Sequence, residues 1–213
     1  MNANAVPMLD QGPGWRAAGG LALATLVVFG FLYSLAGARL GGAMFPHQAN
    51  GSVVAQGGRI VGSALVAQPF AGDAYFHPRP SAAGYDPMAA AGSNQARSNP
   101  ALRERVAEAR AAVAAREGIA PRDVPTELIT QSGSGLDPDI TPAGARVQVA
   151  RVARARGLDA DAVERLLIAC TRPPRFGLLG EPRVNVLELN LALDARAAPR
   201  RAIEAPASRT GAQ

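Results

Sequence analysis

The 213-residue sequence carries a formal net charge of +5 and only 5% aromatic residues, so aliphatic side chains must build its core. All 22 positive residues are arginines, and the lack of lysine excludes both the lysine-dependent phosphate loop of ATPases and Schiff-base catalysis. Because the arginines are spread along the chain among carboxylates, we expect a mixed, solvated surface and no nucleic-acid-binding stripe.

An apolar segment near the N-terminus indicates a membrane span. Positions 17–38 are 22 residues without a charge, between Arg16 and Arg39. A helix of that length rises about 33 Å, which matches a hydrocarbon core of about 30 Å. We therefore expect one transmembrane helix at 17–38. Gly30 and Gly37 are expected to let a partner helix approach closely, although ordinary membrane-helix composition explains them equally well.

A cleaved signal peptide is the alternative for this segment. Positions 36–38 read Ala-Gly-Ala, which fits the small-x-small cleavage pattern. The apolar region of a signal peptide is typically about 7–15 residues, and this one is longer. We favour an uncleaved anchor. Positive residues are nearly balanced on the two sides of the segment, so charge does not decide its orientation.

Residues 39–194 are expected to form one soluble α+β domain of short strands and about four helices, followed by a disordered tail at 195–213. Positions 51–66 indicate a β-hairpin with a Gln-Gly-Gly turn at 56–58. Positions 69–100 are rich in Gly, Pro, Asn and Ser and predict a long loop.

Capping residues predict where three helices begin. Asn99 precedes Pro100, Thr141 precedes Pro142, and Asp159 opens the third helix. The stops are glycines at positions 118 and 157 and the proline at 173. Glutamates 104, 108 and 117 of the first helix are expected on its solvated face.

The sequence at 185–194 is compatible with either a strand or a helix. Leucines at alternate positions suit a strand, whereas Asn185 and Glu188 have capping-box spacing and Leu189 with Leu193 suits a helical face. We favour the helix.

A Gly/Ser-rich stretch at 130–142 is the sharpest local feature. Two glycines and two serines precede a helix start, where backbone N–H groups bind phosphate in many proteins. However, Pro142 removes one donor, and Asp137 and Asp139 repel an anion. We favour a tight loop in which the carboxylates and Thr141 satisfy the turn and the helix start.

Catalytic and metal centres are not expected. His77, Ser132 or Ser134, and Asp137 offer the residue types of a hydrolase triad, but the Gly-x-Ser-x-Gly elbow is missing from the sequence. Cys170 is the only cysteine, which excludes an intramolecular disulfide, and it lacks the paired spacing with histidine that zinc requires. A membrane-anchored or exported hydrolase is kept as the alternative function.

Several longer blocks, taken in order, resemble the C subunit of the bacterial Kdp-type potassium-transporting ATPase, the KdpC family. The resemblance covers about residues 21–194 and includes one N-terminal membrane helix. The blocks are FPHQANGS at 45–52, GSALVAQPF at 62–70, YFHPRPSA at 75–82, GSN at 92–94, VPTELIT at 124–130, SGLD at 134–137, Gln148 with residues 151–153, and RVNVLELNLALD at 183–194.

The resemblance implies a single-pass protein of the cell inner membrane, with residues 1–16 cytoplasmic and 39–194 periplasmic. It implies a non-catalytic accessory subunit needed for assembly of a channel-like potassium subunit with a P-type ATPase subunit. The family is also described as raising the affinity of the ATPase subunit for ATP. That description implies nucleotide contacts at Ser132, Gly133, Ser134, Gly135 and Gln148, with ATP shared between subunits and no tightly bound cofactor.

Overall fold

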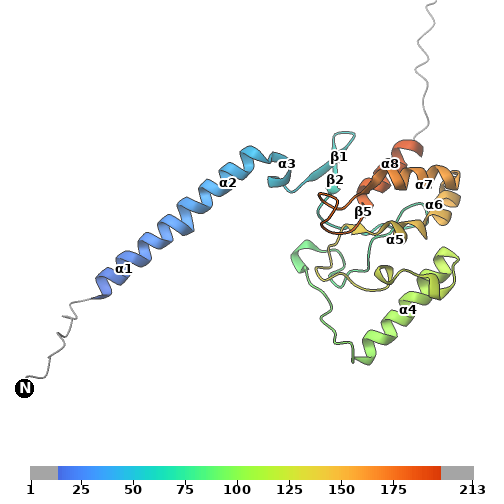
Figure 1. Cartoon of the computed structure of the whole chain (residues 1–213), viewed down its shortest axis with the longest axis horizontal. Coiled ribbons are helices and arrows are strands. Elements are labelled where there is room, and N and C mark those ends of the chain that lie inside the picture. The colour runs from blue at the N-terminus through green and yellow to red at the C-terminus, as the bar shows by residue number, and fades with distance from the viewer. Residues whose placement is uncertain (1–13, 198–213) are drawn as a thin grey trace, which may run out of the picture. The chain divides into compact units, whose positions relative to one another are not determined.

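The computed structural model describes residues 14–197, and these fall into two compact units divided between Ser52 and Val53. The first unit is the apolar helix with a short helical turn, and the second is the soluble domain (Figure 1). The predicted cytoplasmic segment up to residue 13 and the predicted tail from residue 198 lie outside the described residues.

The first unit is helical from Gly14 to Met44, 31 residues long and apolar enough to cross a membrane. It comprises α1 (Gly14–Thr25), a π-helical stretch (Leu26–Leu32) and α2 (Tyr33–Met44). In the π-helical stretch the backbone N–H of Tyr33 donates to the carbonyl of Val28, five residues earlier. The short helix α3 (Pro46–Ala49) follows, with its proline at the first turn. The long helix Gly14–Met44 thus contains the charge-free segment 17–38 and extends beyond both of its ends.

The soluble domain begins with the predicted hairpin. Strand β1 (Val53–Gln56) pairs antiparallel with β2 (Arg59–Ser63). Both turn residues, Gly57 and Gly58, have positive φ angles of 58° and 79°. A two-residue turn with both φ values positive matches the twist of the flanking strands, and glycine adopts it without a steric penalty.

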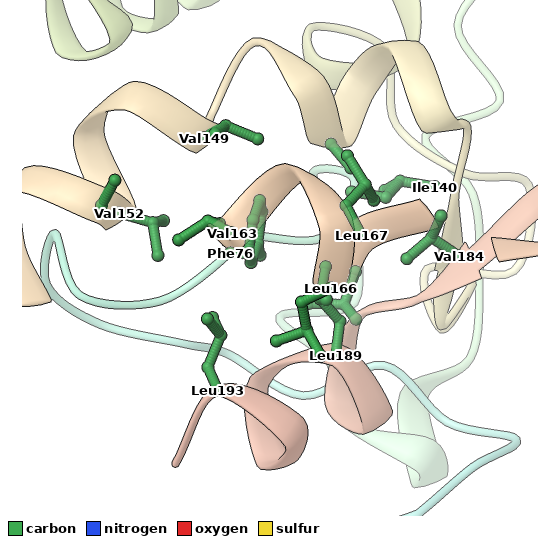
Figure 2. Close-up of a cluster of buried hydrophobic side chains, with 13 residues drawn as sticks. Phe76, Ile140, Val149, Val152, Val163, Leu166, Leu167, Val184, Leu189 and Leu193 are labelled. Carbon is green, nitrogen blue, oxygen red and sulfur yellow. The ribbon is translucent and has the colours of Figure 1, made fainter. Parts of the chain in front are cut away.

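A small sheet and four helices form the main core. The sheet has the order β3–β5–β4, all antiparallel, with β3 Asp139–Ile140, β4 Thr171–Arg172 and β5 Arg183–Asn185. Around it lie α5 (Pro142–Arg146), α6 (Val149–Arg156), α7 (Ala160–Cys170) and α8 (Val186–Ala197). Figure 2 shows Phe76, from a segment with no regular secondary structure, among the core side chains of α6, α7 and α8. The predicted α+β class is confirmed.

Helix α4 (Pro100–Glu117) has its own apolar cluster, and its C-terminal end meets the group of α5 to α8 near α6 (Figure 1). The Asn99 side chain accepts a hydrogen bond from the backbone N–H of Ala101, and Gly118 ends the helix in the left-handed conformation. Both predicted caps are confirmed. The cluster consists of Val113, Ala114, Val124, Leu128 and Ile129. Short 3₁₀ turns lie before α4 at Pro87–Ala89 and after it at Pro121–Asp123 and Thr126–Leu128.

The helix predicted after Thr141 is interrupted. It divides into α5 and α6, and the backbone N–H of Gln148 donates to Ala145, three residues earlier. The carbonyl of Gly144, which a regular helix would offer to that N–H, instead accepts from the side-chain amide of Gln148 at 3.1 Å. One side chain therefore replaces a helical hydrogen bond and ends the regular ladder.

Residues 186–194 are helical, as favoured from the capping-box spacing, and Asn185 is the last residue of strand β5. The side chain of Asn185 accepts from the backbone N–H of Glu188 at 3.1 Å. Leu189 and Leu193, one turn apart, are both fully buried. The helix continues to Ala197, three residues past the predicted end of the domain.

Candidate functional site

Two buried amide side chains hold the backbone of Phe76 and His77. Asn190 of α8 accepts from the N–H of Phe76 at 2.8 Å and donates to its carbonyl at 2.9 Å. Gln148 accepts from the N–H of His77 at 2.8 Å and donates to its carbonyl at 3.1 Å. Each amide thus forms the pair of hydrogen bonds that a neighbouring strand would otherwise provide.

Two arginines of α6 hold the backbone of residues 73–75, which directly precede Phe76. Arg151 donates through Nη1 to the carbonyls of Asp73 and Tyr75, at 2.7 and 2.9 Å. Arg156 donates through Nε to the carbonyl of Ala74. Five consecutive carbonyls, from residue 73 to residue 77, therefore accept side-chain hydrogen bonds. We call residues 73–77 the clamped segment, and we call the four side chains that hold it the clamp: Gln148, Arg151, Arg156 and Asn190.

Gln148 has no spare hydrogen-bonding capacity. Its oxygen accepts from His77 and from Nη2 of Arg151 at 2.9 Å, and its nitrogen donates to His77 and to Gly144. A glutamine amide has two donors and one oxygen with two lone pairs, so all four positions are used. The side chain is also fully buried.

A buried ion pair connects the clamp to α4. Arg151 Nε lies 2.9 Å from Glu117 Oε2, and Arg116 Nε lies 2.7 Å from the other carboxylate oxygen. The Glu117 side chain is 0% exposed and that of Arg151 only 4%. The prediction that Glu117 lies on a solvated helix face is therefore wrong. Its position at the C-terminal end of α4 places it where the helix meets α6, and the arginine offsets its desolvation.

The last clamp arginine joins three segments of the chain. Arg156 pairs with Asp194 of α8 at 2.8 Å, and its guanidinium lies 4.8 Å from the ring centre of Tyr75. This distance allows a cation–π interaction. The Arg156 side chain is 7% exposed and that of Asp194 34%, so the pair is partly buried.

A cavity of about 310 Å³ lies beside the clamped segment, between it and α4. The His77 ring reaches its wall while Nε2 is 3.0 Å from the carbonyl of Gly72. Burial of the ring lowers the pKa of His77 below 6.5, and the nearby charges of Arg116 and Arg151 add to this lowering. The lining is otherwise mostly apolar: Pro69, Phe70, Pro78, Pro80, Tyr85, Ala109, Ala112, Val113, Arg116 and Leu128.

The Gly/Ser loop packs closely against the segment 80–92. The Ser81 hydroxyl donates to the carbonyl of Gly135 at 2.6 Å, and the N–H of Ser132 donates to Pro80 at 3.3 Å. Gly135 has a φ of 72°, and a Cβ there would lie 2.8 Å from the carbonyl oxygen of Ala91. The glycine is thus required by the backbone and by the close contact.

The predicted nucleotide residues differ in exposure. Ser132 and Gly135 are buried, whereas Gly133 and Ser134 are exposed, and the Ser134 hydroxyl accepts from the N–H of Leu136. Within residues 14–197, no hydrogen bond joins this loop to Gln148. The structure therefore does not assemble these five residues into one pocket, and their contact with nucleotide stays a prediction.

The helix start after the loop is occupied by a carboxylate. Both oxygens of Glu127 accept from the N–H of Thr141, and one also accepts from its hydroxyl. Thr141 in turn accepts from the N–H of Gly144 at 3.1 Å, as the predicted cap. A Cβ on Gly144 would lie 2.1 Å from Glu127 Oε1. Because a negative group already fills this helix N-terminus, the preferred interpretation of the loop as a satisfied turn agrees with the geometry.

The side chains that a hydrolase triad would use are bonded to other residues. His77 bonds to Gly72, and Asp137 pairs with Arg79 at 3.0 Å. In the described part of the chain, neither Ser132 nor Ser134 bonds to His77, and no group of three His, Cys, Asp or Glu residues is placed to hold a metal.

Sequence reasoning missed Asn190, Arg151, Glu127 and the role of Glu117. Asn190 had a local signal, because it is a polar residue between the leucines of a buried helical face. The partners of the other three are distant in sequence, for example 34 residues from Glu117 to Arg151. Their roles follow only from the tertiary structure.

Replacing Gln148 with alanine is expected to destabilise the domain strongly. Gln148→Ala leaves the N–H and carbonyl of His77 and the carbonyl of Gly144 without partners. Each buried unpaired group costs about 1–3 kcal/mol, so for three groups we expect a loss of at least about 3 kcal/mol. In thermal unfolding of the full chain in detergent this corresponds to a fall in Tm of roughly 6–12 °C. Gln56→Ala, at an exposed position, is the control. Equal Tm values for the two variants would contradict the assigned role.

Stability is expected to fall as the pH drops below 6.5. The pKa of His77 is lowered in the folded chain, so the unfolded chain takes up the proton first and is favoured by acid. Between pH 7.5 and 5.5, the Tm of the wild-type chain should therefore fall more than that of His77→Gln. His47→Gln, at an exposed position in α3, should behave like the wild type. If the Tm of His77→Gln depended on pH as strongly as that of the wild type, His77 would not be the cause of the acid destabilisation.

The comparisons with known proteins agree with one another. The family model described as "KdpC: K+-transporting ATPase, c chain" matches residues 15–195. A "Potassium-transporting ATPase KdpC subunit" of Xanthomonas campestris is 58% identical over 192 residues, which cover 90% of this chain and 91% of the relative. Subunits of the same name from Shewanella putrefaciens and Gemmatimonas aurantiaca are 52% identical over 172 residues and 54% over 158. These cover 81% and 73% of this chain, and 86% and 79% of the relatives. The chain therefore belongs to the KdpC family.

Proposed function

We propose that this chain is a non-catalytic accessory subunit of an ATP-driven potassium uptake complex, needed for stable assembly of its channel-like and P-type ATPase subunits. The observation that carries the proposal is the family match over residues 15–195, which includes both the apolar helix and the soluble domain. The relatives are named as subunits of a potassium-transporting ATPase over a similar length.

Chemistry supports a non-catalytic role. The chain has no lysine for a phosphate loop, so ATP hydrolysis belongs to another subunit. A hydrolase based on His77 is not favoured, because the side chains it would need bond elsewhere.

We place the chain in the inner membrane with its domain on the periplasmic side, as the family resemblance implies. The helix Gly14–Met44 is long enough to span the bilayer with some tilt. Gly30 lies in the π-helical stretch and Gly37 in α2, and a Cβ at either would meet no atom within 4 Å. Both glycines are thus open to a helix of another subunit, and we propose that they pack against one.

An effect on ATP affinity would be indirect under this proposal. A nucleotide contact at Gln148 would require breaking a fully bonded, fully buried amide. We propose that Gln148 acts by holding the clamped segment, and that any change in ATP affinity passes to the ATPase subunit through membrane-helix or domain contacts.

Co-expression with the two larger subunits tests the proposal. Potassium-stimulated ATPase activity should be recovered only when this chain is present. Gly30→Leu or Gly37→Leu should lower recovery of the complex about tenfold, equivalent to roughly 1.4 kcal/mol, because added bulk separates the helix backbones. Ala24→Leu, in α1, is the matched control for bulk and apolarity.

A complete complex with normal activity in the absence of this chain would refute the assembly role. Normal recovery with both leucine variants would refute the packing surface alone.

A further inference from the structure

The loop between β4 and β5 carries an exposed apolar tip. The two strands pair antiparallel, with Thr171 opposite Val184, and residues 173–182 connect them. Phe176, Leu178 and Leu179 of this loop are 90%, 87% and 62% exposed. Isolated exposed apolar residues are common, but three within four positions form a patch of the kind that marks an interaction surface. We call these three residues the apolar tip.

Backbone bonds hold the apolar tip in one shape. Arg175 and Leu179 exchange two backbone hydrogen bonds, both 2.9 Å long. Between them, Phe176 has a φ of 55°, which non-glycine residues rarely adopt, followed by Gly177 at 73°. Holding a bulky residue such as Phe176 in the left-handed region costs conformational free energy. Because its ring is exposed to solvent, burial within this chain does not offset that cost. A preformed projection of this kind loses little entropy on binding.

An apolar hollow lies beside the loop. It measures about 310 Å³ and is bordered by residues from both ends of the loop and from α5 and α7. The lining residues are Pro142, Arg146, Ile168, Thr171, Pro173, Pro174 and Pro182. Ile168, in its wall, is 61% exposed. A projection next to a hollow is a shaped surface, which a rigid protein partner matches and a fluid lipid surface does not.

The charge of the loop also favours a protein partner over a lipid surface. Arg175 and Glu181 are the charged residues of the loop 173–182, and they cancel. Attraction to an anionic bilayer requires an excess of basic residues, which this loop lacks. An apolar centre with a balanced charged border is instead typical of protein interfaces.

We propose that the apolar tip inserts into an apolar pocket on another protein subunit of the potassium-transporting complex, whose rim fills the adjoining hollow. The inference rests on the proposed function and specifies the surface that the soluble domain uses. Large exposed side chains at the centre of an interface commonly carry most of its affinity, so the tip residues should dominate this contact.

Pull-down from detergent-solubilised membranes tests the surface in the full complex. With a tagged full-length chain, Phe176→Ser combined with Leu178→Ser should lower co-purification of the other subunits at least about tenfold. The fold should be unaffected, because both side chains are almost fully exposed. Met88→Ser is the matched control, since Met88 is 93% exposed in a different loop. Equal recovery with the double variant and the control overturns the proposal.

A photo-crosslinking amino acid in place of Leu178 identifies what the tip touches. An adduct with another subunit of the complex supports the proposal. An adduct with lipid alone, or with a second copy of this chain, overturns it. The wild-type pull-down distinguishes failure of the proposed function from failure of the docking surface. If the wild-type chain recovers no other subunit, the proposed function fails. If the wild type and the double variant recover the other subunits equally, only the docking surface is refuted.

Discussion

The soluble domain depends on the hydrogen bonding of one short segment that has no strand partner. Residues 73–77 run from the exposed Asp73 to the core at Phe76, where a buried peptide group needs a hydrogen bond. Arg151, Arg156, Gln148 and Asn190 supply these bonds from α6, from the residue before it, and from α8. With its carbonyls and the N–H groups of Phe76 and His77 bonded, the segment places the fully buried Phe76 in the apolar cluster (Figure 2).

The same side chains connect otherwise separate parts of the domain. Gln148 interrupts the helical ladder between α5 and α6, so the break in the helix and the clamp have one cause. Arg151 extends the network to Glu117 and so joins α4 to α6. Arg156 reaches Asp194 and joins α6 to α8. Loosening the clamp would therefore weaken the packing of all three helices at once.

Local sequence signals predicted the features that depend on neighbours in the chain. The Gly57–Gly58 turn, the Asn99 and Thr141 caps and the helical form of α8 all follow from steric or capping rules that act within four residues. The buried state of Glu117 and the four bonds of Gln148 depend on partners far away in sequence, and no periodicity encodes them. Family resemblance identified Gln148 as important, whereas the structure supplies a physical role for it in the fold.

Amide hydrogen exchange at Phe76 and His77 tests the clamp most directly. Both lie within the Gly- and Pro-rich stretch 69–100 and outside any helix or strand, so an ordinary loop would exchange there quickly. Because their N–H groups donate to buried side-chain oxygens, we predict that they exchange as slowly as the amides of α6 and α7. Exchange of these two amides at the rate of the exposed loop around Met88 would contradict the account.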